Sequence, residues 1–171
     1  IEPADGGIRI GALATHRDVE ISPVIRERLP VLAETFRQVA TLRIRNIATV
    51  GGSLAHADPN QDPPVTLMAL GARVRIAGPD GERLLPLDKF FVEYYQTALR
   101  QNELVVGVEL PFPAPGSGSA FIKFLPRTAD DYATVAVTAT LTLKPDGACR
   151  EARIALGSVG PTTLRAREAE A

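Results

Sequence analysis

The segment from Thr49 to Pro64 constrains the fold of this chain more than any other. It reads Thr-Val-Gly-Gly-Ser-Leu-Ala-His-Ala-Asp-Pro-Asn-Gln-Asp-Pro-Pro, with a β-branched pair before two glycines and a polar stretch after them. Because glycine has no Cβ, it allows positive φ angles and lets a backbone approach another group closely. We therefore predict a strand that ends in a ligand-binding loop at Gly51 and Gly52. Taken alone, the glycine pair is also typical of a tight turn.

The charge balance and the cysteine content exclude several classes of protein. Lys and Arg number 19 against 20 Asp and Glu, and the net charge of -1 gives no support to nucleic-acid or membrane-surface binding. A single cysteine, Cys149, excludes an internal disulfide, a thiolate zinc site and a self-contained iron–sulfur cluster. With only His16 and His56 besides, we expect no metal site. No apolar run reaches the roughly 18 residues of a membrane span, and a reducing, cytoplasmic location fits.

The N-terminal two thirds of the chain mixes short strands and helices. We expect a strand over Ile8 to Leu13, a short helix capped by Thr15, a helix from Pro23 to Thr41 that Pro30 kinks or splits, and an extended segment from Leu42 to Ala48. A helix from Pro63 to Leu70, a hairpin with strands Arg73 to Ala77 and Glu82 to Leu85, a loop and short helix from Pro86 to Tyr95, and a strand from Glu103 to Leu110 follow.

The proline- and glycine-rich segment from Pro111 to Gly118 is the best candidate for a domain boundary. Beyond it, alternating apolar residues predict three strands in an antiparallel meander, over Ala120 to Leu125, Thr134 to Lys144 and Cys149 to Ser158. A helix should then run from Leu164 to Ala171. Three strands and one helix leave one sheet face uncovered, so we expect cover from sequence outside this chain. The fold class is α+β.

Three stretches together resemble a known family. They are Ile10 to His16 (Ile-Gly-Ala-Leu-Ala-Thr-His), Ile44-Arg45-Asn46 followed by Thr49 to Pro64, and Lys123 to Arg127 with Asp131 to Val135. In order and spacing they are similar to the FAD-binding medium subunit of the molybdenum hydroxylases, which includes the aerobic carbon monoxide dehydrogenase flavoprotein and the xanthine dehydrogenase FAD subunit. Ser53 and His56 stand where many family members have asparagine.

The resemblance implies a fold and a division into domains. Residues 1–113 would be the second subdomain of a vanillyl-alcohol-oxidase (PCMH-type) FAD-binding domain, 114–118 a linker, and 119–171 the start of the flavoprotein C-terminal domain. Family members carry an earlier glycine-rich flavin motif in about 60 preceding residues, a span usual for a subdomain. Because the chain begins at Ile1 in mid-pattern, we expect it to be part of a longer protein.

The same resemblance implies an FAD site. Its residues would be Thr49, Val50, Gly51, Gly52, Ser53, His56, Asp62, Lys123, Asp131 and Tyr132. Backbone N–H groups of Thr49, Gly51, Gly52 and Ser53 would hold the diphosphate as an amide nest does. Asp62 would accept hydrogen bonds from sugar hydroxyls, Lys123 or Arg127 would place positive charge near the ring, and Tyr132 would cover it. No side chain need act as a catalytic acid or base.

The implied function is electron transfer in a larger enzyme. FAD would take electrons from [2Fe-2S] centres of an iron–sulfur small subunit and pass them to NAD, a quinone, a cytochrome or oxygen. The substrate and a molybdopterin cytosine dinucleotide-type cofactor would belong to a large subunit. One alternative is an assembly or interaction module that keeps the fold without the cofactor. Another is a different nucleotide-binding enzyme that uses the same glycine pair.

Several residues have a second interpretation. Arg43 and Arg45 could form a surface pair or reach the diphosphate, and Asp58 could simply cap the turn before Pro59. The acidic pair Asp130-Asp131 could be a solvated turn, and His56 an ordinary loop residue in indirect contact with the ligand. Cys149 should pack inertly in a strand.

Overall fold

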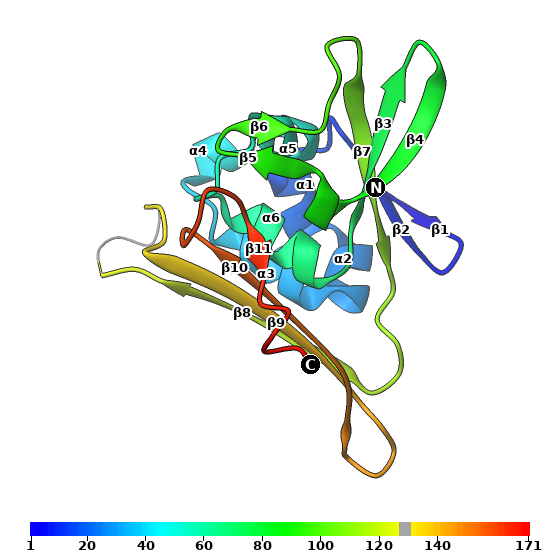
Figure 1. The fold of residues 1–171 in the computed structure, drawn as a ribbon, viewed down its shortest axis with the longest axis vertical. Coiled ribbons are helices and arrows are strands. Elements are labelled where there is room, and N and C mark those ends of the chain that lie inside the picture. The colour runs from blue at the N-terminus through cyan, green and yellow to red at the C-terminus, as the bar shows by residue number, and fades with distance from the viewer. Residues whose placement is uncertain (127–130) are drawn as a thin grey trace.

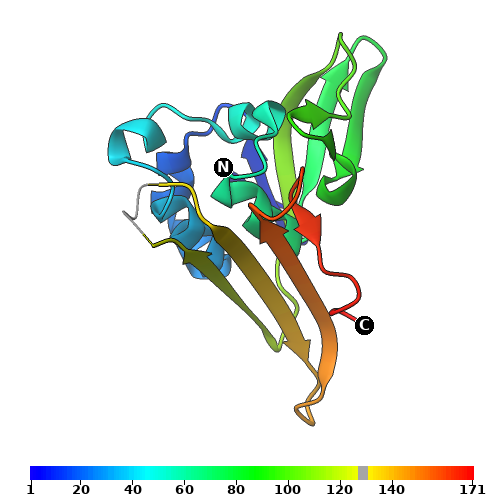
Figure 2. The ribbon, with the colours of Figure 1, turned by 60° about the vertical axis from the view of Figure 1, so that its left-hand side comes forward.

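The computed structural model describes residues 1–126 and 131–171 and contains two main antiparallel sheets (Figure 1). The first sheet has the strand order β1-β2-β7-β3-β4 and the second has the order β11-β10-β9-β8, while β5 and β6 form a small hairpin. The helices lie between the two main sheets, as Figures 1 and 2 both show.

The strands of the first sheet are β1 (Glu2–Ala4), β2 (Gly7–Gly11), β3 (Arg73–Gly78), β4 (Gly81–Pro86) and β7 (Leu104–Pro111). Their register places Ile8 opposite Leu110 and Ile10 opposite Val108, and all four side chains are buried. Alternation along a strand turns every second side chain to the same face. This face therefore forms one side of the core. The predicted strand at Ile8 and the predicted hairpin are confirmed.

The helices are α1 (His16–Ile21), α2 (Pro23–Arg28), α3 (Pro30–Arg37), α4 (Leu42–Arg45), α5 (Val50–His56) and α6 (Asp62–Ala69). Thr15 and Asp18 form a capping box on α1, and Pro30 starts α3 after a break, as predicted. The extended segment predicted over residues 42–48 is wrong, because Thr41 caps the short helix α4 with its side chain. A 3-10 turn, η1 (Leu87–Lys89), precedes β5 (Phe91–Glu93) and β6 (Gln96–Thr97).

The second sheet comprises β8 (Ser117–Phe124), β9 (Val135–Leu143), β10 (Cys149–Gly157) and β11 (Leu164–Arg165). The predicted meander is confirmed, but the helix predicted over residues 164–171 is wrong. Leu164 instead pairs with Leu156, and the Glu170 carboxylate accepts hydrogen bonds from Ile154 N and Arg165 Nε at 2.7 and 2.9 Å. These contacts across the sheet hold the segment in an extended and turned form.

One hydrophobic core joins the two sheets. It runs from Ile10 and Val108 through Phe36 and Leu67 to Ala136 and Ala155 of the second sheet. The opposite face of that sheet exposes Ile122, Phe124 and Leu141. Cys149 lies in a strand, β10, as predicted, but it is exposed, so the prediction that it packs in the interior is wrong.

A chain of buried hydroxyls crosses the same junction. The Thr35 hydroxyl donates to the Val31 carbonyl at 2.8 Å and lies 2.7 Å from the Thr66 hydroxyl, which lies 2.8 Å from that of Thr138. Since a hydroxyl has one proton, Thr66 must donate to Thr35 and Thr138 to Thr66. The chain links α3, α6 and β9.

Candidate functional site

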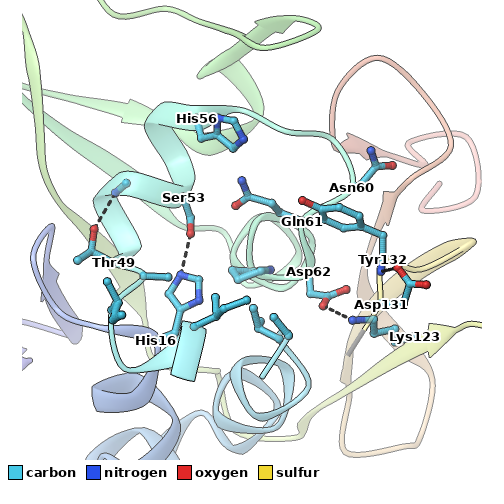
Figure 3. Close-up of a pocket in the computed structure, with 17 residues that line it drawn as sticks. His16, Thr49, Ser53, His56, Asn60, Gln61, Asp62, Lys123, Asp131 and Tyr132 are labelled. Carbon is cyan, nitrogen blue, oxygen red and sulfur yellow. Dashed lines mark hydrogen bonds and ion pairs between the residues drawn. The ribbon is translucent and has the colours of Figure 1, made fainter. Parts of the chain in front are cut away.

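A cavity of about 610 Å³ opens between α4, α5, the start of α6 and the end of β8 (Figure 3). Its size lies in the range of small-molecule and cofactor sites, roughly 300–1,000 Å³. It is lined by His16, Val39, Ala40, Ile44, Ile47, Ala48, Thr49, Gly52, Ser53, His56, Asn60, Gln61, Asp62, Pro63, Lys123, Asp131 and Tyr132.

The first wall is the start of α5, where sequence reasoning predicted a loop. Thr49 caps this helix by accepting a hydrogen bond from Gly52 N at 3.1 Å. The N–H groups of Val50 and Gly51 donate to the carbonyls of Ala14 and Ala12 at 2.9 and 2.8 Å. The Ser53 N–H donates to the Thr49 carbonyl at 3.0 Å. Of the four N–H groups predicted to form an amide nest, those of Gly51, Gly52 and Ser53 are therefore already bonded within the protein, and the prediction is wrong for these three.

The glycine pair serves helix packing. A Cβ on Gly51 would lie 2.5 Å from the Cβ of Ala12, so only glycine lets α5 approach the segment after β2 this closely. A Cβ on Gly52 would lie 2.8 Å from Thr49 Oγ1. Gly52 faces the cavity, whereas Val50 and Gly51 are buried and do not line it.

His16 joins this wall from α1. Its Nε2 lies 2.7 Å from Ser53 Oγ, and its ring packs edge-on against Phe36. Burial lowers the pKa of His16 most, the Thr49 backbone opposes this, and the positive charge of Arg45 lowers it as well; together they bring the pKa to about 4. The imidazole is thus neutral at physiological pH, and the whole wall carries no charge. Sequence reasoning did not assign His16 to the site, although the segment Ile10 to His16 contained it.

The second wall carries a buried ion pair. Lys123 Nζ lies 2.7 Å from Asp62 Oδ2 and also donates to the Gln38 carbonyl at 3.2 Å. The two charged side chains are only 3% and 5% exposed. Burial raises the pKa of the Asp62 carboxyl, while the hydrogen bond and charge of Lys123 oppose that rise. Lys123 comes from β8 and Asp62 from the first turn of α6, so the pair joins the two predicted domains.

Three buried polar atoms around the cavity have no hydrogen-bond partner among the described residues. They are His16 Nδ1, Gln61 Oε1 and Asp62 Oδ1. Buried polar groups are normally paired, and each exception needs an explanation. All three belong to residues that line the same cavity.

Tyr132 and Asp131 stand at the open side of the cavity. The Asp131 carboxylate accepts a hydrogen bond from Tyr132 N at 2.8 Å, and the residue Tyr132 is 61% exposed. Burial of part of the phenol and the negative charge of Asp58 raise the pKa of Tyr132. Asp58 is itself buried and accepts two hydrogen bonds from Asn60, which confirms its role in the turn. Arg127 and Asp130, two further candidates, lie outside the described residues.

The two arginines before the glycine pair, Arg43 and Arg45, differ in exposure and in their partners. Arg45 is nearly buried and pairs with Glu20 at 2.9 Å, whereas Arg43 is exposed. Arg45 is therefore part of the protein's internal structure rather than a surface pair with Arg43.

Of the ten residues named from the sequence, eight line one cavity: Thr49, Gly52, Ser53, His56, Asp62, Lys123, Asp131 and Tyr132. The described residues contain no group of three His, Cys, Asp or Glu side chains that could hold a metal ion. In residues 1–126 and 131–171, no helix is long and apolar enough to cross a membrane.

Two family models match the chain. The first, described as the FAD binding domain in molybdopterin dehydrogenase, matches residues 1–113. The second, described as the CO dehydrogenase flavoprotein C-terminal domain, matches residues 120–171.

Individual proteins are similar over nearly the whole chain. The 6-hydroxypseudooxynicotine dehydrogenase complex subunit alpha of Paenarthrobacter nicotinovorans is 40% identical over 99% of this chain and 57% of its own length. The carbon monoxide dehydrogenase medium chain of Hydrogenophaga pseudoflava is 40% identical over 91% of this chain and 54% of its own. The chain thus spans about half the length of the curated relatives it matches.

Solved structures agree with the observed fold. A carbon monoxide dehydrogenase from Hydrogenophaga pseudoflava, which lacks the Mo-pyranopterin moiety of the molybdenum cofactor, superposes with a TM-score of 0.92 at 38% identity, over 99% of this chain and 59% of that one. Quinoline 2-oxidoreductase from Pseudomonas putida 86 gives 0.91 at 35% identity, over 99% and 58% of the two chains.

Proposed function

This chain belongs to the family of FAD-binding domains of molybdopterin dehydrogenases, and from that premise we propose that it is part of the FAD-binding, electron-transfer subunit of a molybdenum hydroxylase. Its partners would be a [2Fe-2S] small subunit, which supplies electrons, and a molybdopterin large subunit, which binds the substrate. An external acceptor would take the electrons. We also propose the division into residues 1–113 and 119–171, which the ranges of the two family models support.

The observation that carries this proposal is the set of unpartnered buried atoms in the cavity. Asp62 Oδ1 and Gln61 Oε1 are hydrogen-bond acceptors, and His16 Nδ1 lies on the same lining. A buried acceptor without a donor costs about 1–3 kcal/mol, more when it is charged. The ribityl and ribose hydroxyls of FAD are donors of the kind that would satisfy such acceptors. The residues present therefore fit the cofactor.

Each wall would have a distinct task toward FAD. Asp62 would accept from sugar hydroxyls, and Lys123 would keep that carboxyl ionised. Tyr132, exposed beside the cavity, would cover bound flavin from solvent, while Thr49, Gly52 and Ser53 would supply a rigid, uncharged surface. When bound, FAD supplies the exchange of one or two electrons, and positive charge near its ring favours the reduced form.

Titration of the full-length protein tests this function. We expect it to bind FAD, measured by calorimetry and by flavin absorbance, with ADP and NAD as weaker competitors. Tyr132→Leu should weaken binding, while Tyr94→Leu is the matched control because Tyr94 is also exposed but does not line the cavity. Full-length protein that is colourless and takes up no FAD would refute the proposal.

The partner proposal has its own test. Affinity purification of the full-length protein from its native cell should bring down one iron–sulfur and one molybdopterin polypeptide. Their absence from an active complex would count against the assembly.

A further inference from the structure

The cavity wall formed by Val39 and Ala40 follows directly on the end of α3. The last carbonyls of a helix have no partner within the helix, and cations near that end are favourable. Here the Gln38 carbonyl accepts from Lys123, and the carbonyls of Val39 and Ala40 accept from Arg45 Nη1 at 2.8 and 3.0 Å. Three successive carbonyls are thus satisfied by two cations from other elements.

Arg45 is itself fixed by a carboxylate. Its Nε donates to Glu20 Oε2 at 2.9 Å, and the two side chains are 12% and 7% exposed. Glu20 also pairs with Arg17, and the resulting hydrogen bonds and positive charges lower its pKa against the opposing effect of burial. Because the guanidinium is a rigid fork, binding Glu20 through Nε determines where Nη1 points. Glu20 therefore aims Arg45 at the end of α3.

The backbone that Arg45 holds is strained. Ala40 has a φ of 40°, in the left-handed region that residues with a Cβ rarely adopt. Such a conformation persists only where the surroundings impose it, and it is common at ligand sites. Val39 and Ala40 line the cavity, and so does Ile44, the neighbour of Arg45 in the chain.

We propose that Arg45, oriented by Glu20, is a positioning residue for the cavity. Its guanidinium holds the strained Val39–Ala40 segment in place and so sets the shape of the wall that a bound ligand meets. We call the two hydrogen bonds from Arg45 Nη1 to the Val39 and Ala40 carbonyls the clamp. The identity of the ligand as FAD rests on the proposed function, whereas the clamp does not depend on that function. Lys123 holds the preceding carbonyl, so the wall is fixed from two sides.

Hydrogen exchange on the full-length protein without added FAD tests the clamp. The amides of Gln38 and Val39 donate to Thr35 and Phe36 carbonyls and report on this segment. Arg45→Met should raise their exchange rates about tenfold or more, since hydrogen bonds to a charged group are lost. Arg45→Lys should recover part of the protection, because an ammonium reaches a carbonyl but cannot hold Glu20 in the same fork. Arg43→Met, on the same helix but exposed, should match wild type.

FAD titration of the same variants, well below their melting temperatures, tests the consequence. Arg45→Met should weaken FAD binding about tenfold, a difference of about 1.4 kcal/mol, and should shift the visible spectrum of the bound flavin. Glu20→Gln should act in the same direction with a smaller effect. If Arg45→Met only lowers the melting temperature, while exchange at residues 38–39, FAD affinity and flavin spectrum stay at wild-type values, the proposal is overturned. If wild type binds no FAD, the proposed function fails, and the exchange data still decide on the clamp.

Discussion

The two walls that face each other across the cavity are held in opposite ways (Figure 3). The α5 wall is uncharged and is built from backbone hydrogen bonds and the neutral His16, all within residues 12–53. The wall of α6 and β8 depends on one buried ion pair whose members are 61 positions apart in the chain. The first wall is therefore preformed by local structure, whereas the second exists only where two distant segments meet.

Lys123→Met should cause the largest loss of stability, because it removes one partner of the buried ion pair in the charged wall. Removing one member of a buried ion pair leaves the other charge uncompensated, at a cost of about 3–5 kcal/mol. Denaturant unfolding of the full-length protein measures this loss. Lys144→Met removes an exposed lysine from the same sheet region and is the control. Equal stabilities for the two variants would show that the pair does not hold the wall.

Lowering the pH should have the second largest effect on the free energy of unfolding, through His16 in the uncharged wall. The pKa of His16 is about 4 in the folded protein against 6.5 for the ordinary side chain. As the pH falls through this window, the unfolded chain takes up a proton that the folded chain refuses, so the free energy of unfolding decreases. By a pH of about 4.5 the decrease should reach about 2–3 kcal/mol.

Comparison with His16→Gln isolates this contribution, since glutamine cannot titrate. Between neutral pH and a pH of about 4.5, the free energy of unfolding of the variant should fall by about 2–3 kcal/mol less than that of wild type. Parallel pH curves for wild type and His16→Gln would contradict a neutral, buried His16.

Thr66→Val should weaken the junction beneath the charged wall by a smaller amount. It removes the central hydroxyl of the buried chain and leaves the Thr138 donor without an acceptor. We expect a loss of about 1–3 kcal/mol in the free energy of unfolding. Thr140→Val, whose hydroxyl pairs with Ser119 at an exposed position, should change stability by no more than about 0.5 kcal/mol. If Thr66→Val leaves the free energy of unfolding unchanged, the chain of buried hydroxyls does not contribute to stability.

Thr49→Ala should have the smallest effect, because the uncharged wall has many backbone bonds besides this cap. Loss of a helix cap costs about 1 kcal/mol. Thr49→Ser keeps the capping oxygen and should unfold at the wild-type denaturant concentration. If serine destabilises as much as alanine, the cap is not what holds the start of α5.

Local signals explain which elements the sequence predicts well. Pro30 splits the helix, Gly71 ends α6 with a φ of 75°, and Gly81 turns the hairpin, each for reasons confined to a few residues. The helix at Val50 was missed because a glycine pair and a β-branched residue disfavour helices locally. It forms because Thr49 caps it and Gly51 packs on Ala12, a contact between distant residues.

The features of the site also fall into two groups, those visible in short stretches of sequence and those that depend on contacts between distant residues. Resemblance to a family identified eight residues of the cavity lining, all from two of the three stretches that carry it. The pairing of Asp62 with Lys123, the neutral state of His16 and the clamp of Arg45 on Val39 and Ala40 all depend on contacts across the fold. No pattern along the sequence encodes these contacts, so they required the structure.

A crystal structure of the full-length protein with FAD tests the central claim most directly. We predict flavin density in the cavity between the start of α5 and the ion pair of Asp62 with Lys123. A ligand hydroxyl should lie within hydrogen-bonding distance of Asp62 Oδ1. Density for FAD elsewhere, with only water in this cavity, would contradict the account.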